Sequence, residues 1–260
     1  MTASYYGKAG LSLSGKISPN LTRYDLGTNV QVKYVVTTGQ IQLIKPDGKI
    51  ISFLPSELDV ANSSDGIAIY QRGSSGIDGI PKEVFELHAP KINGVTLSYT
   101  RFGTYAKVNV SLSPSIEPLA AFVFGQPTAS GSMPVSGNAS YTSDLFGVVV
   151  KETGSVPPDF YTMGDGYGSA TFSANFGSGT VSTLINLDTD GGGNFGTLNG
   201  SGTITSGGPA FNGTLTGSAN GGFTGAFFGP NAVEMGYVFQ AQGTGFVTYG
   251  NVFGTKAPPP

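Results

Sequence analysis

The chain has 260 residues, a net charge of −3 and no cysteine, and only 11% of its residues are charged, against about 25% in ordinary soluble domains. The missing cysteines exclude a disulfide framework, a cysteine-ligated zinc site and a thiol nucleophile. The weak and unclustered charge provides no basic stripe for phosphate contacts, so nucleic acid is not an expected partner. Ser, Thr and Asn supply most of the polarity among 41 glycines, a composition common in extracellular β proteins, while 17 Phe and 12 Tyr can fill a sizeable core.

The first residues, Met1 to Gly15, have neither the basic start nor the apolar stretch of a signal peptide. We expect that an export segment has been trimmed and that Met1 was added for expression. A cytosolic protein without a signal is the alternative. The cysteine that would carry a lipid anchor is also missing, so a lipidated and a freely secreted chain both stay open.

The first half of the chain predicts strands. Short runs of β-branched and aromatic residues are bounded by Gly, Asn, Asp, Ser or Pro, and no stretch of ten or more residues has helical periodicity. The predicted strands are residues 30–36, 40–44, 84–88, 95–102, 106–112 and 120–124. Single helical turns are predicted at 55–58 and, in the second half, at 230–234.

The connections divide the chain into parts. Residues 45–49, Lys-Pro-Asp-Gly-Lys, predict a tight hairpin turn, since proline presets φ and glycine accepts a positive φ. Residues 61–82 predict a long Gly- and Ser-rich loop, and loops of that length are usually functional or mobile. The Gly/Pro/Ser content of residues 125–136 is typical of a linker. We therefore expect a β-rich domain at 1–124, a second domain at 137–256 and a disordered tail at 257–260.

The second half alternates small and aromatic side chains. Ala170, Phe172, Ala174 and Phe176 share one face of a predicted strand, and Ser and Thr residues share the other. Short, glycine-bearing connections favour an antiparallel meander. Eight such strands can close into a barrel, which leaves no exposed edge and an interior just wide enough for side chains. The eight predicted strands are residues 139–151, 168–176, 180–187, 195–204, 210–216, 222–228, 235–241 and 248–253.

Few residues offer chemistry. His88, the single histidine, is a candidate haem ligand because one neutral imidazole can bind iron; the alternative is an ordinary hydrogen bond at a strand end. Acidic residues are scattered and no serine elbow is present, so no catalytic residue is predicted and an enzyme is not expected. Asp188 to Asn194 places oxygen ligands at alternate positions but lacks the later carboxylates of a calcium loop. It predicts a hairpin tip and no metal site.

Two groups of residues are candidates for ligand contact. Tyr99, Arg101, Phe102 and Tyr105 form the densest aromatic-plus-arginine cluster, a composition favoured at binding hot spots. Packing at the junction between the two halves is the alternative for that cluster. Ile69 and Tyr70, in the predicted 61–82 loop, form the second candidate contact.

Three segments carry a family resemblance. Residues 223–239, with their Gly-Pro-Asn-Ala turn, and residues 250–256 resemble the closing signature of transferrin-binding-protein-B-like proteins. Residues 125–128 with 133–142 resemble the entry to the same barrel, and residues 99–105 resemble a segment upstream of it. The resemblance covers residues 95–256 well and 1–94 poorly. It implies an all-β fold, with an N-terminal handle domain followed by an eight-stranded antiparallel up-and-down β-barrel, in a single-lobe member.

The resemblance also implies a function. Family members are displayed on Gram-negative outer membranes, often as lipoproteins, or released, and they capture host iron proteins, haem or other ligands, often beside a TonB-dependent receptor. We therefore expect a non-enzymatic binding protein at the cell surface or outside the cell, whose partner is an outer-membrane receptor or a host or environmental protein. No cofactor is expected apart from the haem considered for His88. Membrane contact is expected only through a lipid anchor absent from this chain. A structural surface protein, such as a coat, matrix or filament subunit that assembles with itself, is the alternative.

Overall fold

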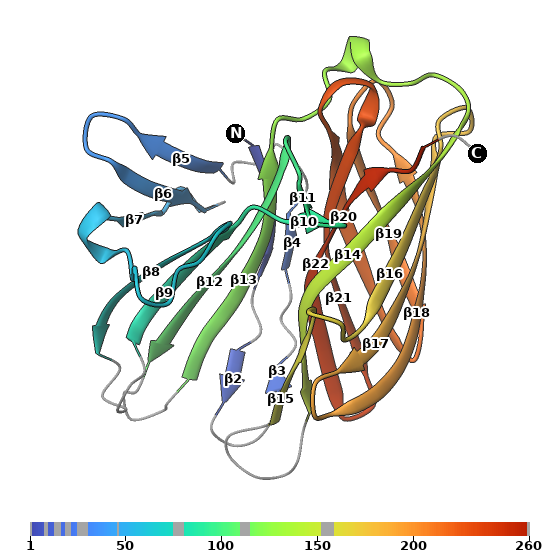
Figure 1. The fold of residues 1–260 in the computed structure, drawn as a ribbon. Helices are drawn as coiled ribbons and strands as arrows, with labels where there is room; N and C mark the ends of the chain where they lie inside the picture. Colours follow the sequence, from blue (N-terminus) through green and yellow to red (C-terminus); the bar gives the residue numbers. More distant parts are fainter. Residues whose placement is uncertain are drawn as a thin grey trace.

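The computed structural model describes the backbone of residues 2–7, 10–12, 17–18, 22–24, 31–45, 47–74, 81–109, 115–151 and 159–258. Within these ranges the protein is all-β, and its only helical elements are three single 3-10 turns, η1 (Pro55–Glu57), η2 (Ser130–Ser132) and η3 (Pro230–Ala232). A curved sheet, the handle, lies beside a closed barrel (Figure 1). The predicted fold class is confirmed.

The handle is a sheet whose main path runs β7-β6-β5-β1-β13-β12-β9-β8. β2 pairs with β13 and β3, β4 pairs with β1, and β10 and β11 form a separate hairpin. The strands are β1 (Thr2–Gly7), β2 (Gly10–Ser12), β3 (Ile17–Ser18), β4 (Thr22–Tyr24), β5 (Gln31–Val35), β6 (Gln40–Ile44), β7 (Ile50–Phe53), β8 (Ile67–Ser74), β9 (Pro81–His88), β10 (Lys91–Ile92), β11 (Val95–Thr96), β12 (Thr100–Asn109) and β13 (Ser115–Gly125).

One arginine joins the two ends of the handle sheet. Arg72 of β8 donates to the backbone oxygen of Ser52 on β7 at 2.7 Å and forms an ion pair with Glu83 at 2.5 Å. Its guanidinium lies 4.6 Å from the ring centre of Phe53, which stacks on Phe85 at 5.4 Å in the handle core. The first and last strands of the sheet path are therefore held together over a shared aromatic core.

The barrel runs β14-β16-β17-β18-β19-β20-β21-β22 and closes where β14 pairs with β22. A further strand, β15, pairs with the C-terminal part of β14 outside the ring of eight. The strands are β14 (Asn138–Lys151), β15 (Asp159–Met163), β16 (Ser169–Asn175), β17 (Thr180–Thr189), β18 (Gly193–Ile204), β19 (Ala210–Gly217), β20 (Ala219–Phe228), β21 (Glu234–Gly243) and β22 (Phe246–Lys256).

Aromatic side chains fill the barrel interior, as the alternation predicts. Phe172, Phe211, Phe223, Phe227 and Tyr237 form one cluster with neighbouring ring centres 5.0–6.3 Å apart, and each of the five is at most 2% exposed. The Tyr237 hydroxyl lies 2.6 Å from the Thr183 hydroxyl. Burial raises the pKa of Tyr237, so its proton stays in place. The interior is a packed core.

The ladder between β14 and β16 has a gap. β14 pairs with β16 only through residues 138–141 and with β15 only through residues 147–151. Between these segments the Leu145 N–H donates to the carboxylate of its neighbour Asp144 at 2.8 Å, and the Ser143 hydroxyl reaches across to the Ala170 oxygen, also at 2.8 Å. Side chains thus replace ladder bonds where β14 passes the handle.

Several expectations need correction in the handle. Residues 61–82 are not one long loop, because β8 occupies Ile67–Ser74 and β9 begins at Pro81. Residues 95–102 are not one strand, because the chain turns between β11 and β12. The handle strands β1–β4, β7 and β10 were not predicted, nor was β15 beside the barrel. The turn at 55–58, the hairpin at 45–49 and the hairpin tip at 188–194 are confirmed.

Some predicted segments lie at or beyond the limits of the described residues. Positions 110–112 of the predicted 106–112 strand are outside them, as are Met1 and residues 259–260 of the expected tail. A linker was expected at 125–136; the chain between the end of β13 and the start of β14 spans residues 126–137 and contains η2. The Ala257 N–H still donates to the Ser140 oxygen at 2.9 Å.

Candidate binding cleft between handle and barrel

The handle and the barrel are joined by segments that the sequence resemblance singled out. The buried carboxylate of Glu234, at the start of β21, accepts hydrogen bonds from the backbone N–H groups of Ser98 at 2.7 Å and Tyr99 at 2.9 Å. The Tyr99 oxygen accepts from the Gln126 N–H, and the Gln126 oxygen accepts from the Gly229 N–H. The resembling segments 99–105, 125–128 and 223–239 are therefore all part of the connection between the handle and the barrel.

Glycines make this close approach feasible. Gly229 has a φ of +70°, a conformation that L side chains rarely adopt, and a Cβ there would lie 2.5 Å from the Tyr99 ring. A Cβ on Gly125 would overlap the Tyr99 carbonyl oxygen. The Gly-Pro-Asn-Ala turn and the end of β13 thus need glycine where the handle and barrel touch.

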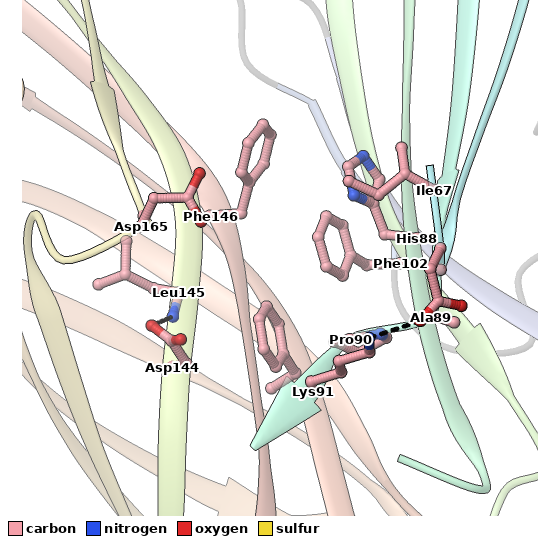
Figure 2. A pocket seen from close by; sticks show the side chains of 14 residues that line it. Ile67, His88, Ala89, Pro90, Lys91, Phe102, Asp144, Leu145, Phe146 and Asp165 are labelled. Atoms are coloured by element: carbon pink, nitrogen blue, oxygen red, sulfur yellow. Dashed lines mark hydrogen bonds and ion pairs between the residues drawn. The ribbon is translucent and has the colours of Figure 1, made fainter. Parts of the chain in front are cut away.

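A cleft opens beside this junction, between the handle and β14 (Figure 2). Its volume is about 260 Å³. The handle side is formed by the start of β8, the end of β9, β10 and β12, and the barrel side by β14, β22 and the turn after β15. The residues that line the cleft are Asp65, Gly66, Ile67, His88, Ala89, Pro90, Lys91, Phe102, Asp144, Leu145, Phe146, Gly164, Asp165 and Phe253.

The floor of the cleft is aromatic. His88 stacks on its cross-strand partner Phe102 at 4.3 Å, and Phe102 stacks on Phe253 at 5.1 Å and on Phe146 at 5.6 Å. Two of these rings come from the handle and two from the barrel. The stack therefore forms part of the contact between the two, and only its partly exposed ring, that of Phe146, can meet a ligand.

His88 has defined partners within the stack. Its Nε2 lies 3.4 Å from the carboxylate of Glu86, which also accepts from the Thr104 hydroxyl at 3.1 Å. The hydrogen bond with His88 holds the pKa of Glu86 below its usual range. His88 is 9% exposed, with its ring between Phe102 and Phe146. These contacts are those of the alternative, an ordinary hydrogen bond at a strand end. The role of His88 as a haem ligand stays a prediction.

The rim of the cleft is acidic. Asp65 forms an ion pair with Lys91 at 2.8 Å, which holds the pKa of Asp65 below its usual range. Asp144 and Asp165, on the barrel side, have no ion-pair partner among the described residues. The cleft therefore presents two uncompensated carboxylates above an aromatic floor.

The predicted cluster at 99–105 divides between the two faces of β12, because successive side chains of a strand point to opposite faces. Phe102 faces the barrel in the cleft floor, whereas Tyr105 lies in the handle core. Arg101 donates to the backbone oxygens of Leu97 and Thr100. Together with Tyr99 at the junction, the four residues do not form one surface.

Ile69 and Tyr70 lie on the edge strand β8. The backbone of Ile69 bonds to Asp59 and Ser63, and the Tyr70 ring is tilted against Phe53 at 6.1 Å. Both side chains are half-buried, and partial burial raises the pKa of the Tyr70 hydroxyl. A second hollow of about 410 Å³ adjoins β8 and shares Gly66, Ile67, His88 and Ala89 with the cleft.

Sequence reasoning missed the barrel side of the cleft. Asp144 and Phe146 occupy outward positions of β14, where a polar or exposed residue is ordinary, and Asp165 lies in a turn with a φ of 51°. No spacing pattern connects them with His88 or Phe102. Among the described residues, no group of three His, Asp or Glu side chains could hold a metal ion. In that part of the chain no helix is long and apolar enough to cross a membrane.

The fold defines a class of two-part all-β proteins, in which a handle sheet and a closed barrel are joined into one scaffold. Residues 133–257 match the family model for the C-lobe and N-lobe beta barrels of Tf-binding protein B. The barrel belongs to this family, and the resemblance first noted in its closing strands is confirmed.

Solved structures extend the similarity to the handle. A double mutant of transferrin binding protein B from Haemophilus parasuis Hp5 is 22% identical, with a TM-score of 0.54 over 98% of this chain and 44% of that one. The protein from serogroup B Neisseria meningitidis is 16% identical, with a TM-score of 0.54 over 99% of this chain and 44% of that one. These similarities establish the fold. This chain spans less than half the length of either protein, and no curated protein sequence matches it.

Proposed function

We propose that this chain is a surface-displayed or secreted binding protein of a Gram-negative bacterium that captures an iron-carrying host protein. The handle-and-barrel fold over nearly the whole chain supports this role, since the proteins of that fold from Haemophilus parasuis and Neisseria meningitidis are named for binding transferrin. Binding by loops and exposed side chains on a rigid scaffold requires no catalytic group.

The free end of the handle is the contact surface that we propose. Tyr34 is 60% exposed, Val36 82% and Leu54 45%, and the Tyr34 hydroxyl and Pro55 both approach Gly39. Partial burial and, after it, the nearby Tyr34 hydroxyl raise the pKa of Tyr70, so the predicted contact residue Tyr70 adjoins this group. We call Tyr34, Val36, Leu54 and Tyr70 the handle patch. Exposed apolar groups of this kind often mark protein contacts.

Surface plasmon resonance with the immobilised chain tests this function. Iron-loaded transferrin, iron-free transferrin and haemoglobin are the probes, and saturable 1:1 binding of one of them is expected. The double variant Tyr34→Ser/Val36→Ser should weaken binding at least about tenfold, because contact aromatics commonly carry much of the binding energy. Leu184→Ser, which removes a 43%-exposed apolar side chain from the barrel wall, is the matched control.

Two outcomes would contradict the proposal. If none of the three proteins binds and light scattering shows large oligomers, the structural surface protein becomes the better interpretation. If binding survives in the Tyr34→Ser/Val36→Ser variant, the handle patch is not the contact. Passage of the ligand to an outer-membrane receptor is a further part of the proposal, tested by adding solubilised outer membranes to the loaded chip.

Haem itself is tested separately. A haem titration should give no Soret band that depends on His88, because Nε2 faces Glu86 and the ring is stacked on Phe102. A band that is lost in His88→Ala would instead assign the predicted ligand role to this residue.

A further inference from the structure

The cleft carries a chemistry of its own, distinct from the handle patch. Its two walls come from different parts of the chain, and its volume of about 260 Å³ lies just below the roughly 300–1,000 Å³ of pockets for drug-sized ligands. A cleft of this size accommodates one large side chain or a small molecule of similar bulk. Both walls are held in place, since the junction at Glu234 and the aromatic stack fix the handle against the barrel.

The negative charge of the rim favours a positively charged ligand. Among the described residues of the lining, Lys91 is the only lysine or arginine, and it is already paired with Asp65 at 2.8 Å. Asp144 and Asp165 lie on the opposite wall without a cationic partner in the described part of the chain (Figure 2). An anion would face two carboxylates there, whereas a cation would neutralise them.

The aromatic floor favours a planar cationic group. Phe146 is partly exposed, and its ring forms one side of the cleft beside the barrel carboxylates (Figure 2). A guanidinium is planar, stacks on aromatic faces and binds carboxylates through two parallel N–H donors, while an ammonium is a more strongly hydrated point charge. The apolar side chains of Ile67 and Phe253 suit the slender hydrocarbon stem that carries such a group.

We propose that the cleft binds a guanidinium group on a slender apolar stem, with Phe146 stacking on the planar cation and Asp144 and Asp165 as its anionic partners. An arginine of an extended peptide segment and a free small guanidine share this chemistry. The inference deepens the proposed function by naming one group that a partner presents. The inference can be tested separately from the proposed function, because the side chains of the cleft lie outside the handle patch.

Methyl-detected NMR titration of the full chain provides the test. N-acetyl-arginine amide and the peptide acetyl-Gly-Arg-Gly-amide are the probes for the two sources, and N-acetyl-lysine amide is the comparison. Both arginine probes should shift the methyl signals of Ile67 and Leu145 in a saturable manner. The affinity of the lysine compound should be lower by a factor of about three or more. If only the peptide binds, the cleft recognises arginine within a chain; if the free amide binds equally well, it is a site for small guanidines.

Variants with preserved shape assign the carboxylates. Asp144→Asn retains the oxygen that accepts from the Leu145 N–H, and Asp165→Asn places a residue that tolerates positive φ in the turn. The double variant should keep the fold and lose about tenfold in affinity. Asp159→Asn, on β15 and outside the cleft lining, is the control. Equal binding of arginine and lysine probes, or unchanged affinity in the double variant, would overturn the proposal, while transferrin or haemoglobin binding would be unaffected by that result.

Discussion

Glu234 and Tyr99 are separated by 135 positions, yet the carboxylate of one accepts the backbone N–H of the other at 2.9 Å. The second carboxylate oxygen accepts the Ser98 N–H at 2.7 Å, and Glu234 is only 4% exposed. A buried carboxylate with two donors is satisfied, and the same carboxylate without them would be costly. This pair therefore connects the handle directly to the barrel.

Glu234→Ala should lower the free energy of unfolding by about 2–4 kcal/mol, because it removes two hydrogen bonds to a charged acceptor. Glu234→Gln should cost less, since one oxygen remains to accept one N–H. Urea denaturation followed by circular dichroism measures both. Asp190→Asn, an exposed carboxylate on a hairpin tip, is the control and should change stability by less than about 0.5 kcal/mol. Equal stability of Glu234→Ala and the parent chain would show that the handle and barrel are held by other contacts.

The hydroxyl pair inside the barrel allows a comparison of two deletions. Thr183 donates its proton to the Thr171 oxygen at 2.7 Å, so Tyr237 is the donor in the 2.6 Å bond to Thr183. Tyr237→Phe removes a donor and leaves Thr183 bonded, at a cost of about 1 kcal/mol. Thr183→Val leaves the buried Tyr237 hydroxyl without its hydrogen-bond acceptor and should lower the free energy of unfolding by about 1–3 kcal/mol. The order of the two costs, measured by urea denaturation, is the prediction. The reverse order would contradict this assignment of the proton.

Arg72 should control the stability of the handle edges. Arg72→Ala removes the bonds to Ser52 and Glu83 together with the contact over Phe53, and hydrogen exchange in β7 and β8 should become faster. Arg72→Lys should restore only part of the protection, because an ammonium cannot form the same fork. Lys33→Ala, a change of an exposed lysine on β5, is the control. Unchanged exchange in both strands would mean that the sheet ends are held independently of Arg72.

Glu86 should make the fold sensitive to acid. Its pKa is lowered in the folded protein by the hydrogen bond with His88, so its carboxylate form stabilises the native state. That contribution is fully present above the ordinary value of 4.5 and is lost as the pH falls through the lowered folded pKa. Melting temperatures measured between pH 6 and pH 3 should therefore fall more steeply for the parent chain than for Glu86→Gln. Parallel curves would exclude this carboxylate as a source of acid sensitivity.

The barrel could be predicted from sequence because strands such as β16 and β17 alternate buried and solvent-facing side chains. Phe172 and Phe211 point inward among small residues, and this pattern permits only one register. β8 was missed because Ile67-Ala-Ile-Tyr is apolar on both faces and is flanked by Gly and Ser, which predict a loop. β15 was missed because it is short and lies outside the repeating pattern.

The cleft could not be predicted, because it forms where handle and barrel segments that are far apart in the sequence meet. His88 was singled out as the single histidine, but nothing near it in the sequence indicates Phe146 or Asp144. Their positions depend on how the handle sheet packs against β14 and β22, and that arrangement is set by Glu234 and two glycines. The candidate cluster at 99–105 was identified by composition, and strand alternation then distributes it over both faces of β12.

The interrupted ladder beside β14 gives the barrel a preferred place to open. Residues 142–146 of β14 have their strand neighbour β22 on one side and side-chain bonds on the other. Local opening of the barrel wall would begin at this segment, which includes Asp144. A ligand bound in the cleft would therefore stabilise this part of β14. Ligand affinity and resistance of the barrel wall to local opening would then increase together.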